Sequence, residues 1–146
     1  MLLPWESPET GVKFQGQATS FVGMQFRAKD RLTVDDALSL MYSMLYQEDP
    51  DKVIDFAAQL STGDAVKRPD YWFYLATAFG QKLRHFERGS AEWQSARDNA
   101  LDSARRAVAI DPLYRQRLWT ISEPDGFDDD LAPLRDDADF RALVGR

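Results

Sequence analysis

The spacing of hydrophobic side chains predicts two short helices in the first half of the chain. Between residues 37 and 45 the hydrophobic positions recur on one wide helical stripe, and Thr33 before them suits a helix N-cap. The pattern stops before Pro50, which suits the first position of a second helix that runs to about Leu60. We therefore expect residues 33–61 to form a first helical hairpin.

The strongest helical pattern begins at residue 70. Over the next seventeen residues or so, hydrophobic side chains occupy two faces of a single helix. These side chains are Trp72, Leu75, Ala76, Phe79, Leu83 and Phe86 on one face, and Tyr71, Tyr74 and Ala78 on the other. A helix that is hydrophobic on two sides must be covered on two sides, so this helix is expected at the centre of the fold.

A second long helix is predicted over residues 91–110, after Ser90, which suits its N-cap. One stripe of this helix consists of small residues. The stripe contains Ala96, Ala100, Ala104 and Ala107. Small side chains let two helix backbones approach closely, so the helix is expected to pack against the preceding one across a short turn. Residues 70–111 thus predict a second, long antiparallel hairpin.

The two ends of the chain have weaker patterns. Residues 1–32 are expected to be irregular, because three glycines interrupt any regular spacing, although their hydrophobic content suits packing along the domain or along another chain. Residues 113–146 predict a short helical turn, a loop and one or two short helices. No segment requires a strand, so residues 1–146 are expected to form a single all-α domain with an acidic C-terminal tail that caps it.

The long hairpin resembles a tetratricopeptide repeat, a helix pair with a sparse motif of aromatic, leucine and small residues. The matching positions are Trp72, Leu75, Ala76 and Phe79 on the first helix, and Ala100, Ala104, Ala107 and Pro112 on the second. The repeat is atypical, because Phe79 and Ala100 are about a dozen residues further apart than usual and Ala104 replaces an aromatic residue. Residues 130–143 are similar to the segment that often follows the last repeat. The resemblance implies antiparallel helical hairpins stacked in a right-handed superhelix, with C-terminal helices that cap the stack.

Composition excludes several classes of function. The chain of 146 residues has a net charge of −6 and a pI near 4.7, which argues against nucleic acid as a partner because phosphate binders need basic side chains. It has no cysteine and one histidine, so thiol chemistry and Cys- or His-rich metal sites are excluded. No hydrophobic run is long enough to cross a bilayer, and the first residues lack the pattern of an export signal. We therefore expect a cytoplasmic protein with no membrane partner.

The acidic tail and the single histidine are the remaining candidates for chemistry. The spacing of the tail carboxylates lacks the alternation of a calcium-binding loop, so helix capping by residues 128–130 and 136–139, together with solvation, is the preferred interpretation. His85 has no nucleophile motif nearby, and the chain has no phosphate-binding loop or dinucleotide motif. We expect no catalytic residue, no cofactor and no metal.

The resemblance also implies a binding surface, because the first helix of each hairpin lines the concave side of such proteins. On the helix that begins near residue 70, the positions expected to face a partner are Phe73, Thr77, Gly80 and Gln81. Gly80 leaves a gap that suits either a partner side chain or close packing of the N-terminal segment. The leading hypothesis is an interaction module or scaffold that binds a peptide, another protein or itself, without catalytic activity.

Two other hypotheses remain open. In the second hypothesis, the chain is a structural or regulatory subunit that assembles with itself, or with a separately encoded effector, through residues 1–32. A carboxylate-based or metal-dependent enzyme ranks last, because abundant acidic residues do not by themselves provide catalytic geometry.

Overall fold

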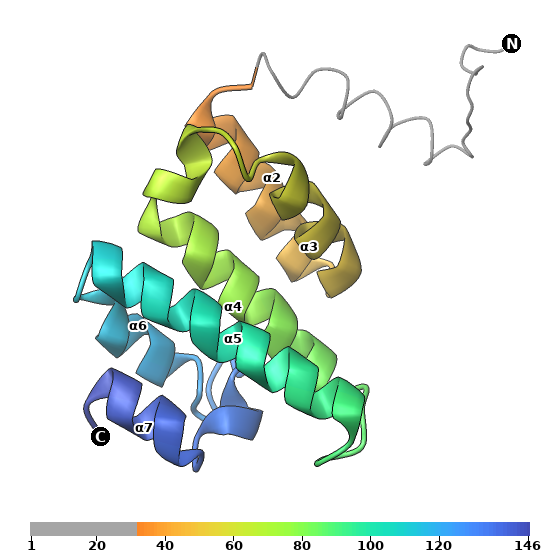
Figure 1. The fold of residues 1–146 in the computed structure, drawn as a ribbon, viewed down its shortest axis with the longest axis vertical. Coiled ribbons are helices and arrows are strands. Elements are labelled where there is room, and N and C mark those ends of the chain that lie inside the picture. The colour runs from red at the N-terminus through yellow and green to blue at the C-terminus, as the bar shows by residue number, and fades with distance from the viewer. Residues whose placement is uncertain (1–31) are drawn as a thin grey trace, which may run out of the picture. The chain divides into compact units, whose positions relative to one another are not determined.

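The computed structural model describes residues 32–146, which form an all-helical fold (Figure 1). In chain order the six α-helices are α2 (Val34–Tyr46), α3 (Pro50–Gln59), α4 (Pro69–Leu83), α5 (Ala91–Ile110), α6 (Tyr114–Thr120) and α7 (Ala138–Val144). Two short 3₁₀ helices, η2 (Asp64–Lys67) and η3 (Ala132–Leu134), lie in the connections. No strand occurs within these residues, so the predicted all-α class is confirmed for them.

The chain divides into two compact units between Ala37 and Leu38. The described part of the first unit is residues 32–37, where α2 begins. Thr33 caps this helix as predicted, because its Oγ1 accepts a hydrogen bond from the backbone N–H of Asp36 at 3.0 Å. The segment expected to be irregular, residues 1–32, lies outside the described residues apart from its last position.

Short-range signals in the sequence also set the start of α3 and of α5. Asp49 caps α3 through a hydrogen bond from the backbone N–H of Lys52, and Pro50 occupies the first helical position. Ser90 caps α5 by accepting a hydrogen bond from the backbone N–H of Trp93 at 3.1 Å. These helix starts were expected from residue type alone, and the structure confirms them.

Helix α4 ends earlier than its hydrophobic pattern predicts. The pattern continues to Phe86, but the regular helix ends at Leu83. The backbone N–H groups of the next three residues bond to carbonyls only three residues back, which tightens the chain into a turn. Gly89 then adopts a φ of +87°, a conformation that suits glycine, and the chain reverses into α5.

Helix α4 lies at the centre of the fold, as expected from its two hydrophobic faces. Helix α5 runs alongside it (Figure 1), and all four alanines of the predicted stripe are buried in the cluster of side chains between them. On another side α4 packs against α3, where the Tyr71 hydroxyl donates a hydrogen bond of 2.7 Å to the backbone carbonyl of Ala57. Covering on both sides is what the hydrophobic pattern requires.

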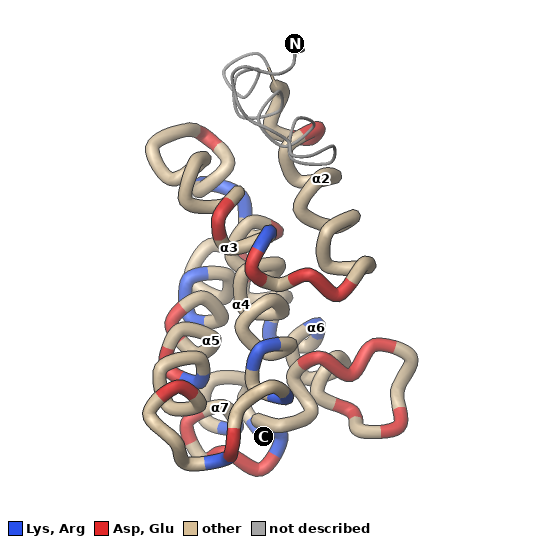
Figure 2. The backbone as a smooth tube through the Cα atoms, turned by 90° about the vertical axis from the view of Figure 1, so that its right-hand side faces the viewer, with Lys and Arg blue, Asp and Glu red and all other residues tan. Residues whose placement is uncertain are grey.

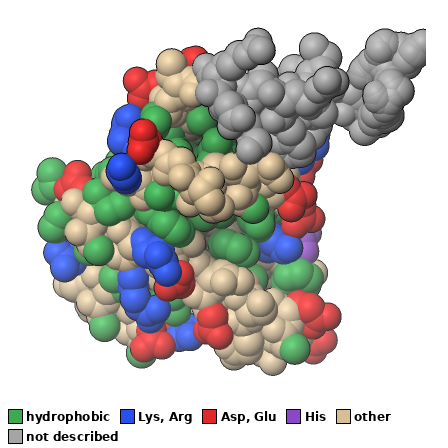
Figure 3. Space-filling model, turned by 45° about the horizontal axis from the view of Figure 1, so that its top comes forward, with side chains coloured by type: hydrophobic (Ala, Val, Ile, Leu, Met, Phe, Trp, Pro, Cys, Tyr) green, Lys and Arg blue, Asp and Glu red, His purple; other side chains and the backbone are tan. Residues whose placement is uncertain are grey.

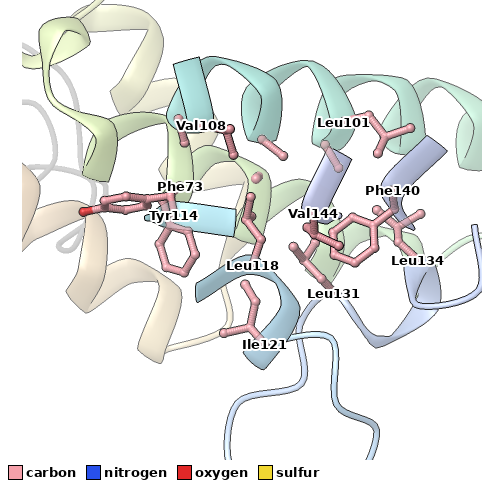
Figure 4. Close-up of a cluster of buried hydrophobic side chains, with 14 of the residues drawn as sticks. Phe73, Leu101, Val108, Tyr114, Leu118, Ile121, Leu131, Leu134, Phe140 and Val144 are labelled. Atoms are coloured by element: carbon pink, nitrogen blue, oxygen red, sulfur yellow. The ribbon is translucent and has the colours of Figure 1, made fainter. Parts of the chain in front are cut away.

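The C-terminal tail completes the hydrophobic core. Figure 4 shows side chains of the tail meeting those of α4 and α5 in one cluster. The tail contributes Tyr114, Leu118, Ile121, Leu131, Leu134, Phe140 and Val144, all of them buried. Because α6, η3 and α7 each contact α4 or α5, the tail is an integral part of the core.

An ion-pair cluster joins α5 to the start of α7. Arg97 donates two hydrogen bonds to the two carboxylate oxygens of Asp137, at 2.9 and 3.0 Å, and a third to Asp139. Asp137 also caps α7 by accepting from the backbone N–H groups of Asp139 and Phe140. Burial alone raises the pKa of Asp137, but the hydrogen bonds from Arg97 and from the backbone outweigh it and lower the pKa below the usual 3.8.

Replacing Asp137 by asparagine is expected to lower the free energy of unfolding by about 1–2 kcal/mol near pH 7, because Arg97 loses the carboxylate to which it makes two hydrogen bonds, while the cap is retained. A carboxylate with a lowered pKa stabilises the fold above its unfolded-state pKa, and this contribution is lost as the pH falls through the folded-state value. Urea denaturation of the wild type and D137N should therefore differ near pH 7 and converge as the pH falls through the lowered folded-state pKa of Asp137.

Asp136 provides the matched control for this test. Its side chain is exposed and pairs with Arg141 at 3.5 Å, so D136N should change stability by less than about 0.5 kcal/mol. Equal losses in D136N and D137N, or a D137N difference that persists unchanged in acid, would contradict a charge-dependent link between α5 and α7.

Candidate partner-binding groove

Two cavities lie between the C-terminal half of α2, helix α4 and the loop of residues 121–131. The smaller one, called the inner cavity here, has a volume of about 80 Å³. Its lining residues are Tyr42, Leu45, Tyr46, Phe73, Tyr74, Thr77, Ile121, Asp128 and Asp130. Most of this wall is aromatic or aliphatic, so the inner cavity suits a hydrophobic group.

The larger, outer cavity adjoins the inner one and has a volume of about 380 Å³. It is lined by Leu45, Tyr46, Glu48, Gln81, Phe127, Asp128, Asp129 and Asp130. Four of these residues also line the inner cavity, so the two form one continuous groove. Figure 2 shows the loop between α6 and η3 projecting from the rest of the helices, with acidic positions along it.

The groove is built around the stripe of α4 that was predicted from the sequence to face a partner. Phe73 and Thr77 line the inner cavity, and Gln81 lines the outer one. These side chains are only 6–7% exposed, so they form the floor of the groove and not its rim. Gly80 lies beneath the tail, and a Cβ added there would clash with the backbone of Asp130 and with Leu131.

The gap above Gly80 is therefore filled by the chain's own C-terminal tail. Of the two occupants considered for this gap, a partner side chain or the N-terminal segment, neither fits while residues 130 and 131 are in place. The close packing of Leu131 on α4 instead fixes one end of the loop that forms the acidic wall of the groove.

Gln81 holds the two walls of the groove together. Its Nε2 donates to the backbone carbonyl of Leu45 on α2, at 3.1 Å, and to the carboxylate of Asp130 on the loop, at 3.4 Å. Its Oε1 is buried and has no hydrogen-bond partner within residues 32–146. A buried acceptor without a donor is unusual in a folded protein.

Electrostatics in the groove favour positive charge. Arg84, directly after α4, pairs with Asp129 and Asp130, at 3.4 and 3.8 Å, and also donates to the backbone carbonyl of Asp129. Burial raises the pKa of the Asp130 carboxyl, against the lowering effects of Gln81 and Arg84. Glu48 and Asp128 also line the outer cavity, and neither has an ion pair in the described part of the chain.

The interpretation of the acidic tail is corrected in one respect. Capping by residues 136–139 is confirmed, because Asp137 caps α7. Capping by residues 128–130 is wrong: η3 starts after Leu131 without any side-chain cap, and these carboxylates line the groove or pair with Arg84. The reason is tertiary, since Asp130 and Leu131 pack against α4 at Gly80.

Three groove residues were missed in the sequence. Tyr42 and Tyr46 were passed over as part of a helix, and Phe127 as part of an acidic loop. They are exposed in the structure and stand at the rim of the groove. The available signal was Phe127 itself, a large hydrophobic residue in a polar loop where a core role is not expected.

A third cavity, of about 400 Å³, lies between the end of α4 and the start of α5, lined by residues that include Phe79, Phe86 and Ser95.

Within residues 32–146, no three acidic or histidine side chains are grouped to share a metal ion. Over the same range, no helix combines the length and hydrophobicity that a bilayer span requires. On the face drawn in Figure 3, hydrophobic side chains reach the surface among groups of basic ones.

Comparisons with known protein families, with curated proteins and with solved structures find no match to this chain. The protein is therefore defined by its own features: an all-helical fold of six helices over residues 32–146, with a groove of aromatic and acidic residues along its central helix.

Proposed function

We propose that the protein is an interaction module, without catalytic activity of its own, that holds a segment of a partner protein in the groove between α2, α4 and the loop of residues 121–131. In this proposal α4 and α5 act as a long tetratricopeptide-like hairpin within a right-handed superhelix, and the tail caps it. The first helix of the hairpin then presents its inner face, with Phe73, Thr77 and Gln81, to the partner.

The observation that carries the proposal is the position of the exposed aromatic residues. Within residues 32–146 the large hydrophobic side chains that are exposed are Tyr42, Tyr46, Ile110, Leu113 and Phe127. Three of the five stand around this one groove. Tyr46 is 79% and Phe127 97% exposed, and exposed aromatic residues around a cavity are typical of protein-binding surfaces.

The rim offers a test that leaves the fold intact. Because Tyr46 and Phe127 contribute little to the core, the double variant Y46S/F127S should remain folded and lose capture of the partner by at least about tenfold. The measurement is quantitative affinity purification from the native host with the full chain as bait, together with circular dichroism of each variant.

Leu113 supplies the matched control. It is 77% exposed and lies outside the groove, so L113S removes a similar exposed hydrophobic side chain elsewhere. The proposal requires proteins that are captured by the wild type and by L113S but not by Y46S/F127S. Equal capture by all three baits would reject the groove as the binding site.

A further inference from the structure

The proposed groove also points to the chemistry of what it holds. We infer that the partner segment is basic and places an arginine side chain in the outer cavity, next to an aliphatic side chain in the inner cavity. This inference rests on the proposed function and specifies the partner for the same groove.

The charges around the outer cavity are unbalanced. Its lining includes four carboxylates, from Glu48, Asp128, Asp129 and Asp130. Within residues 32–146, Arg84 is the cation that pairs with them, and it reaches only the last two. A cationic group in this cavity gains favourable interactions with the carboxylates that line it, whereas an acidic or neutral group does not.

Gln81 fixes the position of one of these carboxylates. Gln81 lines the outer cavity, is more than nine-tenths buried, and its Oε1 lacks a donor within residues 32–146. Both hydrogen bonds of its Nε2 are made to acceptors, so its orientation is set and the carbonyl is the group left over. The amide therefore holds the Asp130 carboxylate in place at the wall of the outer cavity.

The same cavity favours arginine over lysine. A guanidinium has five N–H donors in a rigid plane, which suits carboxylate acceptors that line the cavity from the turn after α2 and from the loop. Tyr46 and Phe127 both line the cavity, and their rings provide aromatic faces on which a guanidinium stacks. Burial raises the pKa of Asp130, and a neighbouring positive charge opposes this shift by stabilising the ionised carboxylate.

The inner cavity selects the neighbouring side chain. Its volume of about 80 Å³ has room for only a few heavy atoms. Leu45, Phe73 and Ile121 contribute to its wall, so an aliphatic side chain of the size of valine or leucine fits better than a polar or a bulky aromatic one. The two adjoining cavities together predict a basic residue beside an aliphatic residue.

The test is an NMR titration of the isotope-labelled full chain with short capped peptides. The reference probe is acetyl-Gly-Arg-Leu-Gly-amide, and its analogues carry citrulline, lysine or glutamate in place of arginine, or glycine in place of leucine. The arginine peptide should shift the side-chain amide signals of Gln81 and the backbone signals of residues 45–48 and 127–130. The citrulline, lysine and glycine analogues should bind at least about fivefold more weakly, and the glutamate analogue should not bind.

Matched charge variants separate a local effect from the overall charge. E48Q/D128N removes two carboxylates of the groove, and D55N/E87Q removes two exposed carboxylates elsewhere, so both change the net charge from −6 to −4. The first variant should weaken binding of the arginine peptide by about tenfold, and the second by less than twofold.

Several outcomes overturn the inference. These are equal binding of the citrulline, lysine or glutamate analogue, shifts confined to residues outside the groove, equal losses in the two charge variants, or no shift at millimolar peptide. The proposed function is judged separately by the capture experiment. If Y46S/F127S loses a partner that carries no arginine at its contact, the result supports the groove as the binding site but rejects a basic ligand for it.

Discussion

Replacing Phe73 by alanine is expected to lower the free energy of unfolding by about 3–5 kcal/mol, the cost typical of removing a buried aromatic ring. The Phe73 ring meets Tyr114 edge-on at 5.6 Å, and the guanidinium of Arg117 lies 4.4 Å from its centre. Tyr114 is in turn held by a hydrogen bond to Asp70, so the ring sits in a network that cannot collapse into the space left behind. Urea denaturation followed by circular dichroism measures the loss.

Phe127 provides the comparison for this prediction. Its side chain is almost fully exposed, so F127A should change stability by less than about 0.5 kcal/mol. A loss below about 1 kcal/mol in F73A would contradict the position of Phe73 in the core. The practical consequence is that F73A is not a clean test of binding, because lost capture would reflect an unstable protein.

Replacing Gly80 by alanine is the second substitution with a large expected effect. The new Cβ would overlap the backbone of Asp130 and lie 2.7 Å from Cδ2 of Leu131, so the tail must move away from α4. We expect G80A to lower the free energy of unfolding by about 2–3 kcal/mol, even though alanine is the better helix former. Hydrogen exchange should increase in the loop of residues 121–131, and the arginine peptide should no longer bind.

Gly63 is the matched control. A Cβ added there would meet only the carbonyl oxygen of Leu60, at 3.7 Å, which is ordinary contact. G63A should therefore keep the stability within about 0.5 kcal/mol of the wild type and leave peptide binding unchanged. If G80A is as stable as G63A and retains the groove, the close packing of the tail on α4 is not what positions the acidic wall.

Comparison of F73A with Y46S/F127S also separates the effects on folding from the effects on binding at the groove. F73A removes a ring from the floor and should unfold the protein at lower urea, whereas Y46S/F127S removes rings from the rim and should not. Binding losses in the rim variant can then be assigned to the groove itself. This distinction was not available from the sequence, where Phe73 is expected to face a partner.

Much of the helical structure is predictable because its signals are local. Thr33, Asp49 and Ser90 start helices by hydrogen bonds that span three residues, and Pro50 acts through its own backbone angle. The alanine stripe of α5 is buried as expected, since small residues at helical spacing permit close packing whatever else surrounds the pair. The end of α4 is misjudged, because hydrophobic spacing continues past the point where the backbone turns.

The groove is predictable only in part, for reasons seen at Gln81 and Gly80. Helical periodicity places Phe73, Thr77, Gly80 and Gln81 on one stripe of α4, and this much follows from residue order alone. What covers the stripe depends on contacts from far along the chain: Gln81 bonds to residues 36 and 49 positions away, and the backbone of residues 130 and 131 fills the space above Gly80. Periodicity identifies which face of a helix is buried, but long-range packing determines which segment covers that face. In this protein the acidic tail packs on α4 and forms one wall of the groove.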